Sequence, residues 1–427
     1  MNLEVRQTVL PNGIRVATCP APHVSSAAMG VWVGIGGRHE PERLCGVSHF
    51  IEHLLFKGTR TRSARDISQA IEGRGGYFNA FTQEEFTCYY ARVGFDHAWR
   101  VLDILADMYR HPRFDPEDIE KERGVILEEM MMYKDRPDQL VQDMLTESLW
   151  PGHPLGRPLV GLEKTLRAMR RSHLLDFKRR RYVPANTILT FAGRVEHETC
   201  VRQTAARLGG MARAPAPVFR PAPRGPARGR IALRKKTLEQ TQLALGFRLF
   251  GRHDPRRYPL KVLNVILGEN MSSRLFQVIR EKHGLAYSIH SSFHLLADTG
   301  ALVVSAGLDR AAGPRALGLI LRELRRFKED LPGSRELRRA KDYIVGQMRL
   351  GLESPSSCMM WVGENLLAYG RVLSPQSIMD AVEAVTARDV RDVAGQVLDP
   401  RRLSLAIVSP ETGPGDEPAW AARLGGL

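Results

Sequence analysis

Cysteine and long apolar runs are both scarce in this chain of 427 residues. The five cysteines lie far apart and include no C-x-x-C pair, which excludes a disulfide framework and a thiolate metal site. No stretch approaches the roughly 18 consecutive apolar residues that a membrane helix requires. The first residues also lack the uninterrupted apolar region of a secretory signal. These absences predict a cytoplasmic protein with reduced cysteines and no membrane association.

Basic residues are abundant, with 62 Lys and Arg against 47 Asp and Glu and a net charge of +15. A nucleic-acid-binding protein gathers such charge in one patch that is interleaved with aromatic residues. Here the basic residues are scattered, and the arginine runs at 179–181 and 224–236 are better explained as solvated faces and a linker. The net charge is the only feature that favours a protein that binds nucleic acid or acidic surfaces. We therefore expect no nucleic-acid partner.

The length of the chain predicts two domains, because single hydrophobic cores stop growing well below 427 residues. The clearest boundary is the segment 211–230, which is rich in proline, glycine and arginine and cannot form a helix or a central strand. We therefore expect an N-terminal domain at 1–210, a linker at 211–230 and a C-terminal domain at 231–427. The segment after Pro410 has a similar turn-forming composition and predicts a loosely packed end.

The order of predicted elements repeats on the two sides of this linker. Each half begins with strands, continues with a helix (46–57 and 258–267), returns to strands, and then enters long amphipathic helices (98–110 and 314–327). Charged helices follow at 115–133 and 334–350. This pattern predicts an α+β fold of two homologous domains, each a mainly antiparallel β-sheet covered by helices.

A metal-binding pattern stands in the first predicted helix, which contains an H-x-x-E-H motif. His49 and His53 are four residues apart, so both imidazoles lie on one helical face, about one turn apart, where they can hold one Zn²⁺. Glu52 lies beside them and is placed to act as a general base on a water molecule at the metal. A surface helix with two histidines is the alternative explanation of this motif.

A catalytic zinc site needs a third protein ligand and an open position for water. The predicted helix at 115–133 offers Glu122, Glu128 and Glu129 as candidates. Glu122 and Glu129 are seven residues apart and share one side of the helix, whereas Glu128 points elsewhere. The apolar residues Val125, Ile126 and Met130 mark the expected buried face.

At this point the sequence resembles a known family. The inverted order H-x-x-E-H is the inverzincin pattern, and the glutamate helix that follows it is similar to that of the pitrilysin/insulinase family of zinc metallopeptidases. The resemblance is strongest to bacterial relatives of the mitochondrial processing peptidase β-subunit. It extends over almost the whole chain, through LPNGIRV, GVSHFIEHLLFKGT, GGYFNAFTQEEFTCYY, ERGVILEEMMMYKDRPD, HPLGRPLVG and SSRLFQVIREKHGLAYS.

The resemblance implies a processing-peptidase-like metallohydrolase fold and a role for each matching residue. His49, His53 and Glu129 correspond to the zinc ligands, Glu52 to the catalytic base and Glu122 to an acidic residue that supports the site. Arg280 and Tyr287 correspond to a pair from the second half that stabilises the negative oxygen of the tetrahedral centre. The second half has no H-x-x-E-H motif, so we expect one zinc ion per chain.

The resemblance also implies how a substrate binds. The strand that contains Asn79, Ala80, Phe81 and Thr82 would offer its edge to a peptide in extended conformation. We therefore expect a zinc endopeptidase that hydrolyses unfolded peptides or presequence-like segments through water activated by Glu52. In this family four such domains enclose a chamber, which implies a homodimer or a heterodimer with a related subunit. The alternative function is that of a non-catalytic partner subunit of a related peptidase complex.

Overall fold

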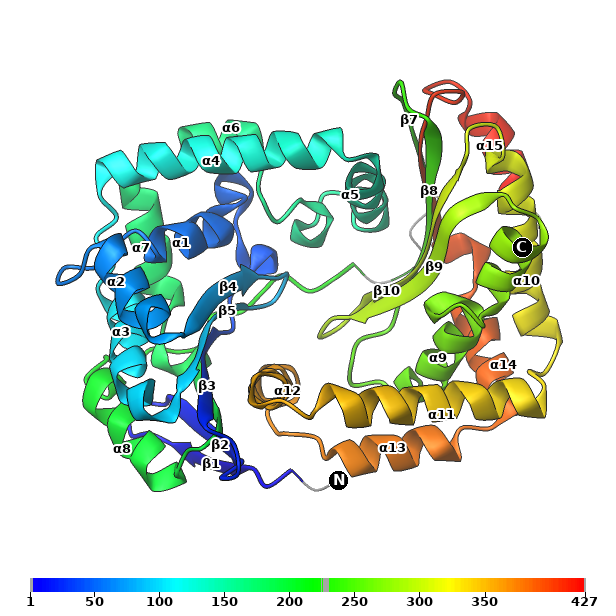
Figure 1. Cartoon of the computed structure of the whole chain (residues 1–427). Coiled ribbons are helices and arrows are strands. Elements are labelled where there is room, and N and C mark those ends of the chain that lie inside the picture. The colour runs from blue at the N-terminus through cyan, green and yellow to red at the C-terminus, as the bar shows by residue number, and fades with distance from the viewer. Residues whose placement is uncertain (1–2, 224, 226–229, 426–427) are drawn as a thin grey trace. The chain divides into compact units, whose positions relative to one another are not determined.

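The computed structural model describes residues 3–223, 225 and 230–425. The chain forms two compact units (Figure 1). Unit 1 contains residues 1–131, 157–220 and 349–375, and unit 2 contains residues 132–156, 221–348 and 376–427. Residues 224 and 226–229 of the predicted linker lie outside the described residues, and the described part of 211–223 contains no helix or strand.

The sheet of unit 1 has six strands in the order β1-β2-β6-β3-β5-β4. All neighbouring strands are antiparallel except β2 and β6, which run parallel. The turn between β1 and β2 lies at the sequence Pro11-Asn12-Gly13, where Gly13 adopts a φ of 104° that disfavours other residues. The strands are β1 Arg6–Val9, β2 Arg15–Pro20, β3 Ser26–Val33, β4 Tyr77–Thr82, β5 Thr87–Gly94 and β6 Thr187–Gly193.

Helices cover both faces of this sheet. On one face, Trp32 and Cys88 pack against α12 in one hydrophobic cluster. On the other face, Tyr89 donates or accepts a hydrogen bond with Tyr182 at the end of α7, and the ring of Phe78 contacts Phe56 just beyond α1. The helices of unit 1 are α1 Val47–Leu55, α2 Ala64–Ile71, α3 Ala98–Arg110, most of α4 Pro116–Asp135, α6 Glu163–Ala168, α7 Arg171–Arg181, α8 His197–Leu208 and α12 Pro355–Tyr369.

The sheet of unit 2 has five strands in the order β7-β11-β8-β10-β9. Only β7 and β11 are parallel neighbours. This order and pattern match the segment β2-β6-β3-β5-β4 of the first sheet, so the repeat predicted from the sequence is present in the topology and the mainly antiparallel α+β fold is confirmed. The strands are β7 Ile231–Lys235, β8 Gln240–Leu249, β9 Ala286–Leu295, β10 Gly300–Asp309 and β11 Leu403–Ser409.

One helix in each unit comes from the other half of the sequence. Helix α5 (Pro137–Leu149) follows the first-half helices but packs its leucines against β8 and β11 of unit 2. Helix α12 belongs to the second half and packs on the sheet of unit 1. The compact units are therefore discontinuous in sequence, unlike the domains drawn from the position of the linker. The other helices of unit 2 are α9 Arg257–Asn264, α10 Gly313–Glu329, most of α11 Ser334–Gly351, α13 Pro375–Ala384, α14 Ala387–Val397 and α15 Glu417–Leu424.

The prediction of a loosely packed end after Pro410 is wrong. Helix α15 forms there, and Trp420 on it is buried against the core of unit 2. The residues of this segment are mostly turn-forming, but the indole of Trp420 provides a large apolar surface. Burial of that surface stabilises the short helix. Among the described residues, no helix has the length and apolar character that crossing a membrane would require.

Candidate metal centre

The H-x-x-E-H motif lies on α1, which is amphipathic and buries Phe50, Ile51 and Leu54. This apolar stripe fixes the rotation of the helix against unit 1. His49 and His53 therefore emerge together on the partly exposed face, with ring centroids 4.6 Å apart. Burial and the neighbouring His53 lower the pKa of His49 to about 4, so this imidazole is neutral at neutral pH, the state that a metal ligand requires.

Two residues that the sequence analysis missed hold the beginning of α1. Gly46 precedes the helix with a φ of 93°, and a methyl group on it would lie 2.7 Å from the Cα of Gly161. Glycine has no side chain that could cap the helix, so the carboxylate of Glu40 caps it instead. This carboxylate accepts hydrogen bonds from the backbone N–H groups of Gly46 (2.6 Å) and Ser48 (2.8 Å). Glu40 is buried, and its carboxyl lies where the helix dipole favours negative charge.

Replacement of Glu40 by glutamine should flatten the pH dependence of stability. Burial raises the pKa of Glu40 to about 7, although the two N–H groups act in the opposite direction. The folded protein therefore binds more protons than the unfolded chain between the ordinary glutamate pKa of 4.5 and this value. The stability contributed by the neutral carboxyl is present at the lower end of this window and is lost as the pH rises through it, by at most about 1.4 kcal/mol per pH unit.

Urea unfolding of the metal-free wild type and Glu40→Gln proteins, from about pH 5 to about pH 8, measures this effect. The free energy of unfolding of the wild type, relative to that of the variant, should decrease as the pH rises. A difference that stays constant across this range contradicts the assignment.

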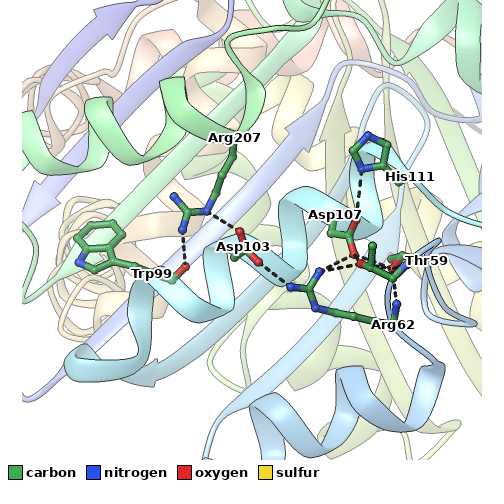
Figure 2. A network of polar contacts seen from close by, with 8 residues as sticks. Thr59, Arg62, Trp99, Asp103, Asp107, His111 and Arg207 are labelled. Carbon is green, nitrogen blue, oxygen red and sulfur yellow. Dashed lines mark hydrogen bonds and ion pairs between the residues drawn. The ribbon is translucent and has the colours of Figure 1, made fainter.

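A polar network fixes the segment that follows α1 onto α3 (Figure 2). Arg62 forms ion pairs with Asp103 (2.7 Å) and Asp107 (2.6 Å) on α3, and Thr59 donates a hydrogen bond to Asp107 (2.6 Å). Arg207 on α8 reaches the other carboxylate oxygen of Asp103 at 3.1 Å. Both ends of α1 are thus tied to the rest of unit 1, which limits how far the two histidines can move.

Helix α4 brings a carboxylate to these imidazoles. Oε2 of Glu129 lies 3.7 Å from Nε2 of His49 and 3.7 Å from Nε2 of His53. The three ligand atoms lie within 4.8 Å of one another. Zinc bonds of about 2.0–2.2 Å in tetrahedral geometry place ligand atoms about 3.3–3.6 Å apart, so the two distances from Glu129 are close to those that a bound zinc ion requires. They form the only such group that the described residues contain.

Glu122, about two turns before Glu129 on α4, orients the second histidine. Its Oε2 lies 3.1 Å from Nδ1 of His53, and its Oε1 lies 2.7 Å from Nζ of Lys57. Burial would raise the pKa of Glu122, but the hydrogen bonds from His53 and Lys57 outweigh it and lower that pKa. An ionised carboxylate only accepts, so Nδ1 of His53 carries the proton and Nε2 directs its lone pair toward Glu129. The sequence analysis did not identify Lys57 as part of this arrangement.

Glu52 stays outside the ligand group. Its Oε2 accepts a hydrogen bond of 2.5 Å from Thr82 on β4. Burial raises the pKa of Glu52, although the Thr82 hydrogen bond acts in the opposite direction. A raised pKa makes Glu52 a stronger proton acceptor than an ordinary glutamate, which suits a general base beside a metal site.

The remaining predicted residues occupy two places. Asn79, Ala80, Phe81 and Thr82 form most of β4, which is an edge strand of its sheet. Arg280 lies in the helical segment Phe276–Lys282 and Tyr287 at the start of β9, both in unit 2. Their side chains are near each other, with the Arg280 guanidinium 5.7 Å from the centre of the Tyr287 ring. Their contribution to the metal centre stays a prediction.

One detail of the α4 prediction is wrong. Ile126 and Met130 are buried as expected, but Val125 is 50% exposed. The buried stripe of α4 follows 119, 122, 126 and 130, at the spacing of three and four residues that one helical face requires. Glu128 is exposed and takes no part in the group of ligands.

Comparison of the sequence with known proteins identifies a family. Residues 15–163 match the family described as insulinase (peptidase family M16), and residues 168–344 match the peptidase M16 inactive domain. An uncharacterized zinc protease of Streptomyces coelicolor is 39% identical over 412 residues, which cover 95% of this chain and 90% of that protein. An uncharacterized zinc protease of Mycobacterium tuberculosis is 40% identical over 415 residues, covering 96% and 94% respectively. The chain belongs to the M16 peptidase family.

A solved structure has the same fold as this chain. The crystal structure of a protease from Helicobacter pylori superimposes with a TM-score of 0.90, covering 96% of this chain and 100% of that one at 20% identity. All residues of the ligand group lie in the segment that matches the first M16 domain, whereas the second matching segment is of the inactive type. The family resemblance expected from the motifs is therefore confirmed.

Proposed function

We propose that this M16 family member is a zinc-dependent endopeptidase that cleaves unfolded peptides or presequence-like segments bound in extended conformation. The observation that carries the proposal is the convergence of His49, His53 and Glu129, with Glu52 adjacent but outside the ligand group. A site with three protein ligands leaves a position for water, as catalytic zinc sites do. A bound zinc ion supplies Lewis acidity and lowers the pKa of that water.

Each neighbouring residue has a task in this proposal. Glu52 takes a proton from the attacking water and returns it to the leaving amine. Thr82 holds the carboxylate of Glu52 toward the β4 edge, and Glu122 keeps the His53 ring in the tautomer that leaves Nε2 free for metal. Arg280 and Tyr287 are proposed as donors to the negative oxygen of the tetrahedral centre.

The edge of β4 is the proposed peptide-binding site. One side of this strand pairs with β5, so the other side presents backbone N–H and C=O groups. A peptide that adds there as a further strand is held mainly through its main chain, which gives little discrimination between side chains. The contact between Thr82 and Glu52 brings that edge to the catalytic carboxylate.

The association of two chains, as a homodimer or with a related subunit, belongs to the same proposal. So does a cytoplasmic location, which agrees with five cysteines that are buried and free. The alternative function is a non-catalytic partner subunit, a role for which the metal ligands would be unnecessary. The presence of the complete ligand group favours the peptidase.

Metal analysis combined with peptide cleavage tests the proposal. We expect about one zinc ion per chain and hydrolysis of unstructured peptides that stops when a chelator removes the metal and returns when zinc is added back. Casein-derived peptides and a folded control protein serve as substrates. Zinc binding without any cleavage, by the chain alone or mixed with a related subunit, would favour the non-catalytic alternative.

A further inference from the structure

A pocket of about 580 Å³ lies on the face of the first sheet opposite the metal centre. Register decides this placement: Tyr77 pairs with Arg92, and Asn79 with Tyr90, so their side chains share one face of β4 and β5. Phe81 belongs to the same face and packs near Trp32 in the cluster beneath α12. All the pocket residues belong to unit 1.

The metal face of β4 carries the alternate residues. Thr82 contacts Glu52, and Phe78 contacts Phe56 beyond the end of α1. Side chains of a peptide paired with β4 alternate in the same way, so successive residues face α1 and the pocket in turn. Tyr77, at the pocket, is five residues from Thr82, or about 17 Å along the strand at about 3.4 Å per residue.

The lining of the pocket favours an aromatic occupant. Tyr77, Tyr90 and Trp361 line it, together with the thioether of Met360. The Tyr77 and Tyr90 rings are already tilted against each other with centroids 6.1 Å apart, and a further ring can stack or meet them edge to face. The side chain of Tyr77 is 54% exposed, so a large aromatic surface on this strand is open to a bound ligand.

Charge does not favour an ionic occupant. The pocket contains one guanidinium, from Arg92, and one carboxylate, from Glu364, so the two formal charges cancel. Glu364 forms no hydrogen bond or ion pair with any residue that the structure describes, and its side chain is exposed at the pocket, although partial burial raises its pKa. A tyrosine hydroxyl or a tryptophan N–H could donate a hydrogen bond to this exposed carboxylate without introducing a net charge.

We infer that this pocket binds an aromatic side chain of an extended peptide paired with β4, about five residues from the bond that is cleaved. The inference rests on the proposed function. The β4 edge binds a peptide mainly through its main chain, and the pocket adds a preference for one side chain. That pocket lies on the face of the sheet away from the metal centre.

A tyrosine scan of one peptide substrate tests the inference. The substrate is a quenched fluorogenic peptide with a single cleavage site, located by mass spectrometry, and tyrosine replaces alanine at each position in turn. Tyrosine at four to six residues from the cleaved bond, on one side of it, should raise kcat/KM about tenfold. Lysine at that position should not.

Variants of the pocket complete the test. Ser356→Trp, which fills the pocket from α12, and Tyr77→Ala, which removes an exposed ring, should both bring the tyrosine peptide down to the rate of the alanine peptide. Phe95→Ala, which removes a partly exposed ring outside the pocket, should leave the preference intact. Equal rates for tyrosine and alanine, a preference for lysine, or a tyrosine preference that survives both pocket variants overturns the inference.

Binding measurements separate this result from the proposed function. If no peptide is cleaved, the proposed function fails, and fluorescence anisotropy of labelled peptides still tests the pocket. A tyrosine peptide should then bind about tenfold more tightly than the alanine peptide, and Ser356→Trp should remove that difference. Equal binding of the two peptides overturns the inference in that case as well.

Discussion

The Glu52→Gln protein should keep its zinc and lose almost all peptidase activity. Glu52 is not one of the three residues whose ligand atoms converge, so zinc content should stay at about one ion per chain. Glutamine is close in size to glutamate and can still pair with Thr82, but its amide cannot take a proton from water. Removal of a general base typically lowers kcat by about 10²–10⁴-fold, and we expect the upper part of this range with KM little changed.

The measurement is steady-state kinetics on an unstructured peptide, with metal content determined on the same samples. Glu72→Gln is a matched control, because it makes the same chemical change at an exposed glutamate of unit 1. This control should retain wild-type kcat. Full activity in Glu52→Gln with zinc in place would show that the proton acceptor is another group.

The sequence predicted the site best where residues able to bind metal recur at helical spacing. The i, i+4 histidines and the seven-residue spacing of Glu122 and Glu129 placed these side chains on two helical faces, and the structure shows the two faces meeting. The repeated order of strands and helices was also visible, because alternation and turn residues are local signals. These features follow from the periodicity of the sequence, which can be recognised without knowing the tertiary contacts.

Other features depend on contacts that no local pattern encodes. Helices α5 and α12 each belong by position to one half of the sequence, yet each packs on the sheet of the other half. Glu40 stands six residues before Gly46, the residue that precedes α1, and only the folded structure shows that its carboxylate accepts hydrogen bonds from two backbone N–H groups there. A glycine that begins a helix without a capping side chain could have prompted a search for such a residue.

The Glu129→Gln protein should fail to retain zinc. The amide oxygen of glutamine carries no charge and is a poorer zinc ligand than a carboxylate, and the two imidazoles alone do not complete a three-ligand site. We expect the affinity for zinc to fall by at least about 100-fold, since even changes to residues behind the ligands cost about 10–100-fold. Activity should fall in proportion to bound metal and recover in part at high zinc concentration.

Zinc-dependent stability gives an independent measure of the same loss, because zinc that binds only the folded state stabilises it. At free zinc of about 100 times the dissociation constant, the wild type should gain about 2.7 kcal/mol in free energy of unfolding, whereas Glu129→Gln should gain far less at that concentration. Glu128→Gln makes the same change at the neighbouring, exposed position of α4 and should behave like the wild type. Wild-type zinc affinity in Glu129→Gln would exclude Glu129 as a ligand and leave the two histidines as the only protein ligands in this group.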